Sequence, residues 1–371
     1  MIVGLVKEIK NNEFRVGLTP DNVKAYVDSG NAVYVESEAG TGSGFPNEEY
    51  VASGATILDS SKEVWDIAEM VIKVKEPIEE EFQYFREGLI LYAYLHLAAE
   101  EKLTNELLKS NMQAVAYETI TDRHGTLPCL MPMSEIAGKM ATLEGAKYLE
   151  KTYGGKGLLL GGVTGVQKAN VVIIGGGNVG KNACKIAVGL GANVTVFDMS
   201  MKQLSHLDDV FGDRIQTLYS TKAAIEKAVS TADLIIGAVL IPGGKAPKLV
   251  TKDMLKLMQK GTVIVDVAVD QGGCIETTKV TTHENPTFIV DDIVHYCVGN
   301  MPGALARTAT IALTNSTLYY GLQIANKGLI QAAKDDSNFA KGINCYEGKC
   351  YFPGVAEAFG LDFTDLNEIL S

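Results

Sequence analysis

Three side chains that could bind and convert a small carboxylate substrate follow predicted strands in the first third of the sequence: Arg15, Lys75 and His96. A guanidinium can hold a carboxylate through two hydrogen bonds, an ammonium can polarise a carbonyl oxygen, and an imidazole can move protons near neutral pH. Each residue alone is also compatible with a solvated turn or, for His96, with a buried core histidine. Because ligands bind beyond the carboxyl ends of strands in open parallel sheets, their joint placement predicts a site for a substrate with a reacting carbonyl or amine.

Two acids in the second half of the chain lie in and after another apolar run, at Asp266 and Asp270. We expect Asp266 to be structural, at the end of the strand. Asp270 should lie in the loop beyond it, next to the nicotinamide ring, where it could orient the substrate nitrogen or help to activate water. Asn300 and Met301 also follow a strand and are expected to wall the nicotinamide and the substrate.

A glycine-rich turn between two apolar runs, followed by an acid, is typical of dinucleotide-binding domains. Gly175 permits the tight turn, Gly177 lets the pyrophosphate approach the backbone, and Gly180 lets helix and strand pack closely. The phosphates would meet unpaired N–H groups at the helix start. Asp198 can accept hydrogen bonds from both ribose hydroxyls, and its charge would repel a 2′-phosphate. The predicted cofactor is therefore NAD rather than NADP.

Further expected NAD contacts lie at strand ends and at a helix start. Ser134, which we expect at the start of a long helix, could touch the cofactor or simply cap the helix. The loop 238–244 should lie where the cofactor's ribose passes. The complete set of expected contacts is Ser134, Gly175, Gly177, Asn178, Val179, Gly180, Asp198, Ser220, Val239, Leu240, Asp270, Asn300 and Met301.

Two sets of alternating strands and helices are needed to position these side chains, and they predict an α/β protein with two doubly wound, Rossmann-like domains. One helix is well marked, with Thr19 as N-cap, Pro20 in the first turn and Gly30 at its end. Other helices are expected from Ser134 to about 154 and over about 305–326. The expected strands are 2–6, 32–36, 70–74, 89–93, 114–117, 171–174, 194–197, 234–238, 263–267 and 288–290.

The C-terminal segment has too few strand signals to form a domain, so we expect it to complete the first one. The substrate domain would comprise residues 1–128 plus 307–371, and the NAD-binding domain residues 129–306. Two chain crossings between domains make a natural hinge, with the cleft between the domains as the site.

Composition excludes several classes of function. The net charge of −12 argues against nucleic acid or an anionic membrane as partner. We see neither a secretion signal nor a membrane-length apolar stretch, so we expect a soluble, cytoplasmic protein. Cys345 and Cys350 could close a small loop, but the cysteine spacing favours reduced thiols. We expect no metal site, and we interpret His295 and Cys297 as structural.

The sequence resembles the bacterial-type alanine dehydrogenases over its whole length. The resemblance implies a homohexamer and a first domain completed by the C-terminal segment. More distant similarity links it to the NAD(H)-binding subunit of proton-translocating transhydrogenase and to saccharopine dehydrogenase. The motifs that carry the resemblance lie at 7–8, 13–20, 74–77, 94–98, 131–138, 175–180, 266–273 and 298–304.

The resemblance implies reversible conversion of L-alanine, NAD and water into pyruvate, ammonium and NADH. Arg15 and Lys75 would hold the substrate, and His96 and Asp270 would move protons. A transhydrogenase subunit would require a membrane partner, and a saccharopine-type enzyme would require room for a longer substrate. The sequence leaves open the physiological direction, the tolerance for other 2-oxo acids, and which proton step belongs to His96 and which to Asp270.

Overall fold

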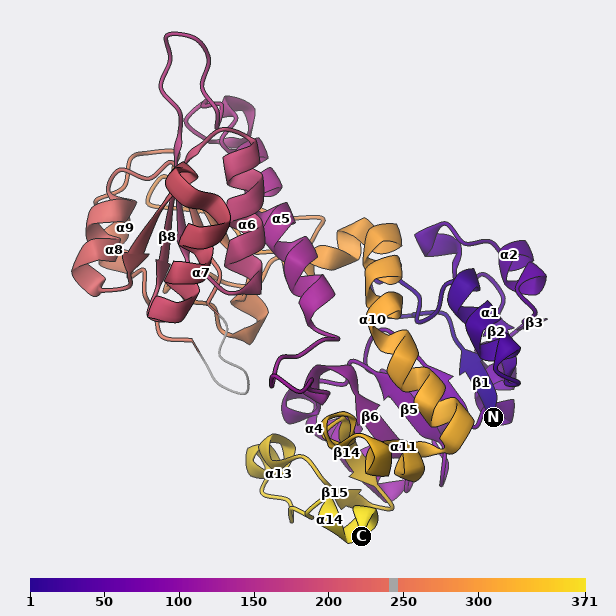
Figure 1. Ribbon diagram of the computed structural model, residues 1–371. Coiled ribbons are helices and arrows are strands. Elements are labelled where there is room, and N and C mark those ends of the chain that lie inside the picture. Colours follow the sequence, from indigo (N-terminus) through magenta and orange to yellow (C-terminus); the bar gives the residue numbers. More distant parts are fainter. Residues whose placement is uncertain (240–245) are drawn as a thin grey trace. The chain divides into compact units, whose positions relative to one another are not determined.

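The structure is a computed structural model that describes residues 1–239 and 246–371 (Figure 1). By its internal contacts the chain forms two compact units. One consists of Met1–Met133 with Gly303–Ser371, and the other of Ser134–Pro302. Each unit is built on one mainly parallel sheet. The expected fold class, with a discontinuous first domain completed by the C-terminal segment, is confirmed.

The first unit contains an eight-stranded sheet in the order β15-β14-β6-β5-β4-β1-β2-β3. The strands β1 to β6 are parallel, whereas β14 and β15 from the C-terminal segment join antiparallel beside β6. Their bounds are β1 (Ile2–Leu5), β2 (Ala32–Glu36), β3 (Thr56–Leu58), β4 (Met70–Ile72), β5 (Ile90–Ala93), β6 (Gln113–Ala116), β14 (Ile343–Tyr346) and β15 (Lys349–Cys350).

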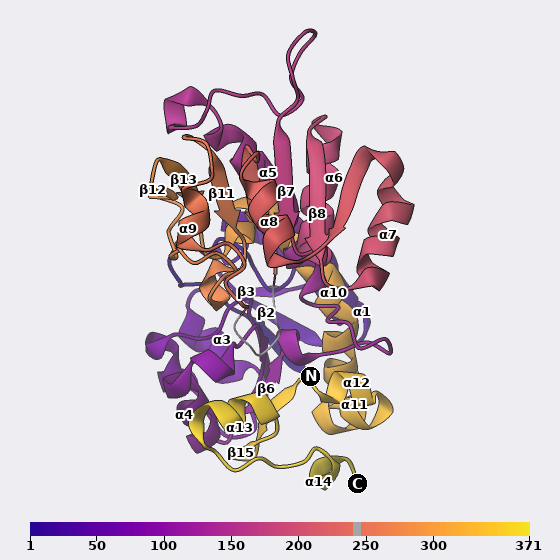
Figure 2. The ribbon, with the colours of Figure 1, turned by 90° about the vertical axis from the view of Figure 1, so that its left-hand side faces the viewer.

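Alternate residues of this sheet enter two separate buried clusters, one on each face. Met70 and Ile72 share one cluster with residues of α1 (Pro20–Asp28) and α10 (Ala306–Lys327). Val71 shares the other with residues of α3 (Ser61–Ile67), α4 (Glu101–Lys109) and α13 (Pro353–Phe359). In both views the C-terminal α13, in yellow, lies beside α4 (Figures 1 and 2). The helices of this unit are α1 (Pro20–Asp28), α2 (Asn47–Ala52), α3 (Ser61–Ile67), α4 (Glu101–Lys109), α10 (Ala306–Lys327), α11 (Leu329–Asp335), α12 (Ser337–Ala340), α13 (Pro353–Phe359) and α14 (Asn367–Leu370), with 3-10 turns η1 (Thr41–Ser43), η2 (Glu79–Tyr84), η3 (Leu97–Ala99) and η4 (Tyr117–Thr119).

Two helices of the first unit show how local sequence fixes their ends and contacts. α1 begins with the expected N-cap Thr19, and Thr19 and Asn22 accept hydrogen bonds from each other's backbone N–H groups. α10 packs closely on α1 at Gly321, where an added Cβ would lie 1.9 Å from the Tyr26 hydroxyl oxygen. Only glycine fits this crossing, so α10 is anchored to α1, the first helix of the chain.

The second unit contains a seven-stranded sheet in the order β12-β13-β11-β10-β7-β8-β9. Numbered within this unit, its parallel strands follow the order 3-2-1-4-5-6 of dinucleotide-binding sheets, and β12 adds an antiparallel edge. The strands are β7 (Asn170–Ile174), β8 (Asn193–Asp198), β9 (Ile215–Tyr219), β10 (Leu234–Gly237), β11 (Val263–Asp266), β12 (Thr287–Val290) and β13 (Ile293–Tyr296).

Helices lie on both faces of the second sheet, with α5 and α6 on one side and α8 and α9 on the other (Figure 1). The helices are α5 (Met131–Tyr148), α6 (Asn178–Gly189), α7 (Met201–Phe211), α8 (Lys222–Val229) and α9 (Lys252–Leu255), with 3-10 turns η5 (Lys151–Tyr153), η6 (Gly212–Arg214), η7 (Val269–Gln271) and η8 (Met301–Leu305).

The start of α5 corrects one expectation. The helix begins at Met131, so Ser134 lies about one turn inside it and is not its first residue. Pro132 is tolerated there because the first turn of a helix does not use its backbone N–H groups. Capping by Ser134 is therefore wrong as an interpretation.

Candidate active site

The carboxyl ends of β4 and β5 bring Lys75 and His96 together. Lys75 Nζ lies 3.4 Å from His96 Nε2. An ammonium group can donate a hydrogen bond to the unprotonated nitrogen of a neutral imidazole. The imidazole also stacks with the Tyr94 ring, with 6.2 Å between ring centroids. An ammonium and a proton acceptor therefore share one edge of the first sheet.

Arg15 is held in the same unit by a buried carboxylate. Its Nε and Nη2 donate to the two oxygens of Glu13 at 2.6 and 2.5 Å, and its Nη1 lies 3.1 Å from the Met133 sulfur. Burial opposes the charge of Arg15, but its hydrogen bonds to Glu13 and the charges around it together outweigh burial and raise the pKa of the guanidinium.

A buried ion-pair cluster lies beneath Lys75. Lys73 Nζ is 2.8 Å from a Glu81 oxygen and 3.2 Å from a Glu8 oxygen, and all three side chains are at most 4% exposed. Burial raises the pKa of Glu8 despite the opposing charge of Lys73. The other oxygen of Glu8 accepts the backbone N–H of Val74 at 2.6 Å and that of Lys75 at 3.4 Å. Glu8 thus connects the buried cluster to the backbone of Lys75.

His96 adopts a left-handed backbone conformation, with φ of 48° and ψ of 34°. This region is uncommon for residues other than glycine and is often found at functional sites. The carboxylate of Glu118, in η4 after β6, accepts the backbone N–H of His96 at 2.6 Å and that of Leu95 at 3.1 Å. Sequence reasoning missed both Glu8 and Glu118, because their partners are distant in the chain.

The glycine-rich turn of the second unit has the shape that a pyrophosphate requires. Gly175 has φ of 101°, and a Cβ on Gly180 would lie 1.8 Å from the Gly175 carbonyl oxygen. A Cβ on Gly177 would meet no described atom within 4 Å, so the space in front of the turn is open. Within the described part of the chain, no side chain caps the start of α6. Its first N–H groups, on Asn178 and Val179, suit a phosphate, so the residues fit the predicted NAD.

Asp198 ends β8 beside this turn. One oxygen accepts the Gly176 N–H at 2.7 Å and the other accepts the Ser200 N–H at 2.8 Å. Each carboxylate oxygen has a second lone pair for a ribose hydroxyl. Ser220 follows the neighbouring strand β9 and donates its N–H to the Asp198 carbonyl oxygen at 2.9 Å. The carboxyl edge of the second sheet therefore carries the acceptors that an adenosine ribose needs.

Among the remaining expected cofactor contacts, all but Leu240 are described residues of the second unit. Asp270 is exposed in the turn η7 after β11. Asn300 is half-buried with φ of 56°, and Met301 next to it is buried. Val239 is half-buried and lies two residues after β10, whereas Leu240 lies outside the described residues.

Other titratable groups of the second unit have structural partners. Asp266 is fully buried, and one of its oxygens accepts the Thr278 hydroxyl at 2.8 Å. His295 is also buried, with its ring nitrogens 2.8 Å from the Thr277 hydroxyl and 3.0 Å from the Ile293 carbonyl oxygen. Burial raises the pKa of Asp266 and lowers that of His295. These contacts agree with the structural roles expected for both residues.

All six cysteines are buried free thiols, including Cys345 and Cys350, which face each other across β14 and β15. Over residues 1–239 and 246–371, no cluster of histidine, cysteine and acidic residues could hold a metal ion. In the same ranges, no helix combines the length and the apolar character needed to cross a membrane.

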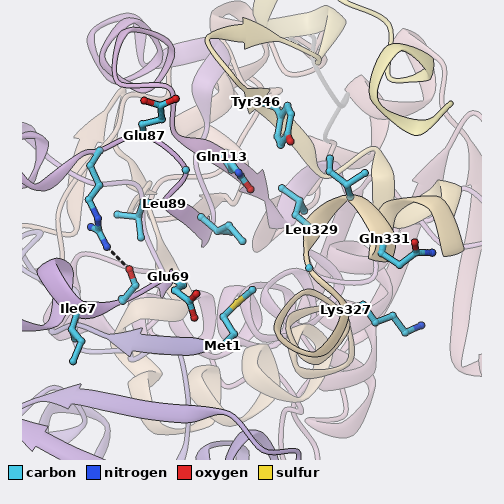
Figure 3. Close-up of a pocket in the computed structure, with 16 residues that line it drawn as sticks. Met1, Ile67, Glu69, Glu87, Leu89, Gln113, Lys327, Leu329, Gln331 and Tyr346 are labelled. Atoms are coloured by element: carbon cyan, nitrogen blue, oxygen red, sulfur yellow. Dashed lines mark hydrogen bonds between the residues drawn. The ribbon is translucent and has the colours of Figure 1, made fainter.

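A separate hollow of about 540 Å³ lies at the opposite, amino-terminal edge of the first sheet (Figure 3). Met1, Glu69, Leu89 and Gln113 line it at the starts of four strands. Glu69 accepts the backbone N–H of Ile2 at 2.5 Å. This hollow is therefore distinct from the edge that carries Lys75 and His96.

The chain matches known proteins over most of its length. The family profile "Alanine dehydrogenase/PNT, N-terminal domain" matches residues 4–137, and "Alanine dehydrogenase/PNT, C-terminal domain" matches residues 141–353. A relative from Methanococcus maripaludis, named alanine dehydrogenase, is 55% identical and covers 100% of both chains. Another of that name, from Staphylococcus haemolyticus, is 54% identical and covers 100% of this chain and 99% of its own.

Solved structures give the same picture. A structure named L-alanine dehydrogenase is 49% identical, with a TM-score of 0.94 over 97% of this chain and 99% of that one. A transhydrogenase from Sinorhizobium meliloti has a TM-score of 0.82 over 95% of this chain and 99% of its own, but is only 24% identical. The second likeness concerns the fold alone.

Proposed function

We propose, from the premise that this chain belongs to the alanine dehydrogenase/PNT family, that it catalyses reversible NAD-dependent oxidative deamination of L-alanine to pyruvate and ammonium. The observation that carries the proposal is the contact of 3.4 Å between Lys75 Nζ and His96 Nε2, in the unit that also holds Arg15. These side chains provide the charges that a 2-oxo acid needs and a group that can move its protons.

Each residue has a role that follows from its chemistry. Arg15, fixed by Glu13, binds the substrate carboxylate, and Lys75 donates to the carbonyl oxygen of pyruvate. NAD, when bound, would accept the hydride that leaves the alanine Cα. An amine can release a hydride from its carbon only when it is unprotonated, so His96 or Asp270 first takes the ammonium proton. The same two residues then move protons as water adds to the oxidised carbon and ammonia leaves.

We further propose that the substrate domain comprises residues 1–128 plus 307–371 and the NAD-binding domain residues 129–306. The expected contacts at Ser134, Asp270, Asn300 and Met301 would then reach the cofactor or the substrate. We also propose a cytoplasmic homohexamer, as the resemblance implies.

The test is oxidation of NADH with pyruvate and ammonium, followed by absorbance. Turnover should require both substrates together, and a panel of 2-oxo acids would define the side-chain tolerance. His96→Ala should abolish turnover while NADH still binds, because the base is lost and the glycine-rich turn is intact. His124→Ala is the matched control, since His124 is exposed in a loop. Turnover without ammonium, or near-normal activity of His96→Ala, would contradict the proposal.

A further inference from the structure

Glu118 occupies the place where the pairing between β5 and β6 stops. The last paired residues are Ala93 and Ala116, and Tyr94 still donates its N–H to the Val74 carbonyl oxygen at 3.1 Å, on the β4 side. The next two N–H groups, of Leu95 and His96, are both received by the Glu118 carboxylate, at 3.1 and 2.6 Å. The Glu118 side chain therefore takes the place of β6 as the hydrogen-bond acceptor for the backbone of His96.

The backbone conformation of His96 explains why this replacement matters. A φ of 48° is unfavourable for a residue with a Cβ and persists only where the surroundings hold it. Hydrogen bonds to an ionised acceptor are shorter and stronger than neutral ones, so the carboxylate can hold it. A return to negative φ would redirect the Cα–Cβ bond of His96 and move Nε2 away from Lys75 Nζ.

The same device occurs at the neighbouring strand end. Glu8 accepts the N–H of Val74 at 2.6 Å and of Lys75 at 3.4 Å, that is, of the functional residue and the residue before it. Both strand ends that carry chemistry thus have a carboxylate acceptor at equivalent positions. Such repetition points to control of the distance between two side chains.

We propose that Glu118 is a positioning residue for the proton transfer, in that its carboxylate fixes the left-handed backbone of His96 and thereby aims the imidazole at the substrate. This inference rests on the proposed function, in which His96 moves the proton. In this proposal Glu118 acts through His96 and does not contact the substrate. Its loss should therefore lower kcat and leave the binding of pyruvate and NADH almost unchanged.

The experiment compares Glu118→Ala and Glu118→Gln with the wild-type enzyme in the pyruvate and ammonium assay. Glu118→Ala should lower kcat by about 100-fold, as expected for a displaced catalytic group, while KM for pyruvate changes by less than about threefold. Glu118→Gln keeps one acceptor oxygen, so its kcat should lie between those of the wild type and Glu118→Ala. Formate or acetate should restore part of the activity of Glu118→Ala, by roughly tenfold, because a small carboxylate can take the vacated place.

Glu69→Ala is the matched control. Glu69 accepts the Ile2 N–H at 2.5 Å at the opposite edge of the same sheet, so its loss removes a similar bond far from the chemistry and should leave kcat unchanged. A crystal structure of Glu118→Ala should show residue 96 at negative φ. If the alanine variant fails to fold, the split between kcat and KM in Glu118→Gln carries the same test.

Two kinds of failure remain distinguishable. A wild-type enzyme without alanine dehydrogenase activity, or an active His96→Ala, would overturn the proposed function. An active wild type with inactive His96→Ala, but with normal kcat in Glu118→Ala or equal losses in kcat and substrate affinity, would overturn the positioning role of Glu118 alone.

Discussion

Replacement of Lys73 by methionine tests whether the buried cluster beneath the site depends on its single cation. Lys73 contacts Glu81 at 2.8 Å and Glu8 at 3.2 Å, and its side chain is 1% exposed. Methionine has a similar length and stays compatible with a buried position. The substitution leaves two buried carboxylates without the charge that balances them.

The size of the effect follows from burial. Removal of one partner from a buried ion pair costs about 3–5 kcal/mol in the free energy of unfolding, because the remaining charge stays desolvated. For a unit of this size, each kcal/mol corresponds to about 2–4 °C in the melting temperature. Lys73→Met should therefore lower the melting temperature by on the order of 10 °C at neutral pH.

The pH dependence has a defined sign. Burial raises the pKa of Glu8 above the ordinary value of 4.5 even with Lys73 present. The contribution of such a group to stability is present at low pH and is lost as pH rises through its folded pKa. Without Lys73 this pKa rises further, so the penalty is largest at pH 8 and shrinks as pH is lowered towards 4.5. The Lys73 charge itself is unaffected in this range, because its pKa is raised from 10.5.

Thermal unfolding of both proteins between pH 5 and pH 8, at constant ionic strength, measures this difference. Lys102→Met serves as the control, since the pair between Lys102 and Glu79 is 2.7 Å long but 78% and 67% exposed. Its loss should leave the melting temperature almost unchanged, because solvent-exposed ion pairs add little to stability. The reasoning is refuted if Lys73→Met is no less stable than this control, or if its penalty does not vary with pH.

Two further predictions concern the cofactor and the assembly. Asp198→Ser should raise the ratio of kcat/KM for NADP to that for NAD by at least about tenfold, because the carboxylate that repels a 2′-phosphate is gone and the hydroxyl can still accept the Gly176 N–H. An unchanged ratio would show that Asp198 does not select the cofactor. Light scattering should give a particle mass about six times the 39.8 kDa of the chain, and a monomer or dimer mass would exclude the proposed hexamer.

The elements that could be predicted from the sequence are those with a strong local signal. The runs at β1, β4 and β5 are short, apolar and flanked by polar turns, and the glycine-rich turn carries its own constraints at Gly175 and Gly180. β13 was not predicted, because His295 interrupts its apolar run. In the structure the His295 ring is buried and stacks on Phe288, with ring centroids 5.0 Å apart. β9 was not predicted either, because its residues are half-buried or exposed and do not form a continuous apolar run. Tertiary partners decide both cases.

The candidate site was accessible to sequence reasoning only in part, for a related reason. A side chain proposed to act on a ligand, such as Lys75 or His96, can be recognised from its type and from its place after a strand. A carboxylate that accepts backbone N–H groups has no such signature, and Glu118 and Glu8 lie 22 and 66 residues from the N–H groups to which they bond most closely.

Those two carboxylates suggest how the fold achieves accuracy at this edge. A parallel strand directs the chain towards the site, but its hydrogen bonding ends before the functional residue. Beyond that point the backbone is free to turn unless new acceptors take up its N–H groups. Glu8 and Glu118 supply them at adjacent strand ends, and the spacing of 3.4 Å between Lys75 and His96 is the result. The geometry of the site is therefore set by side chains that need never touch the substrate.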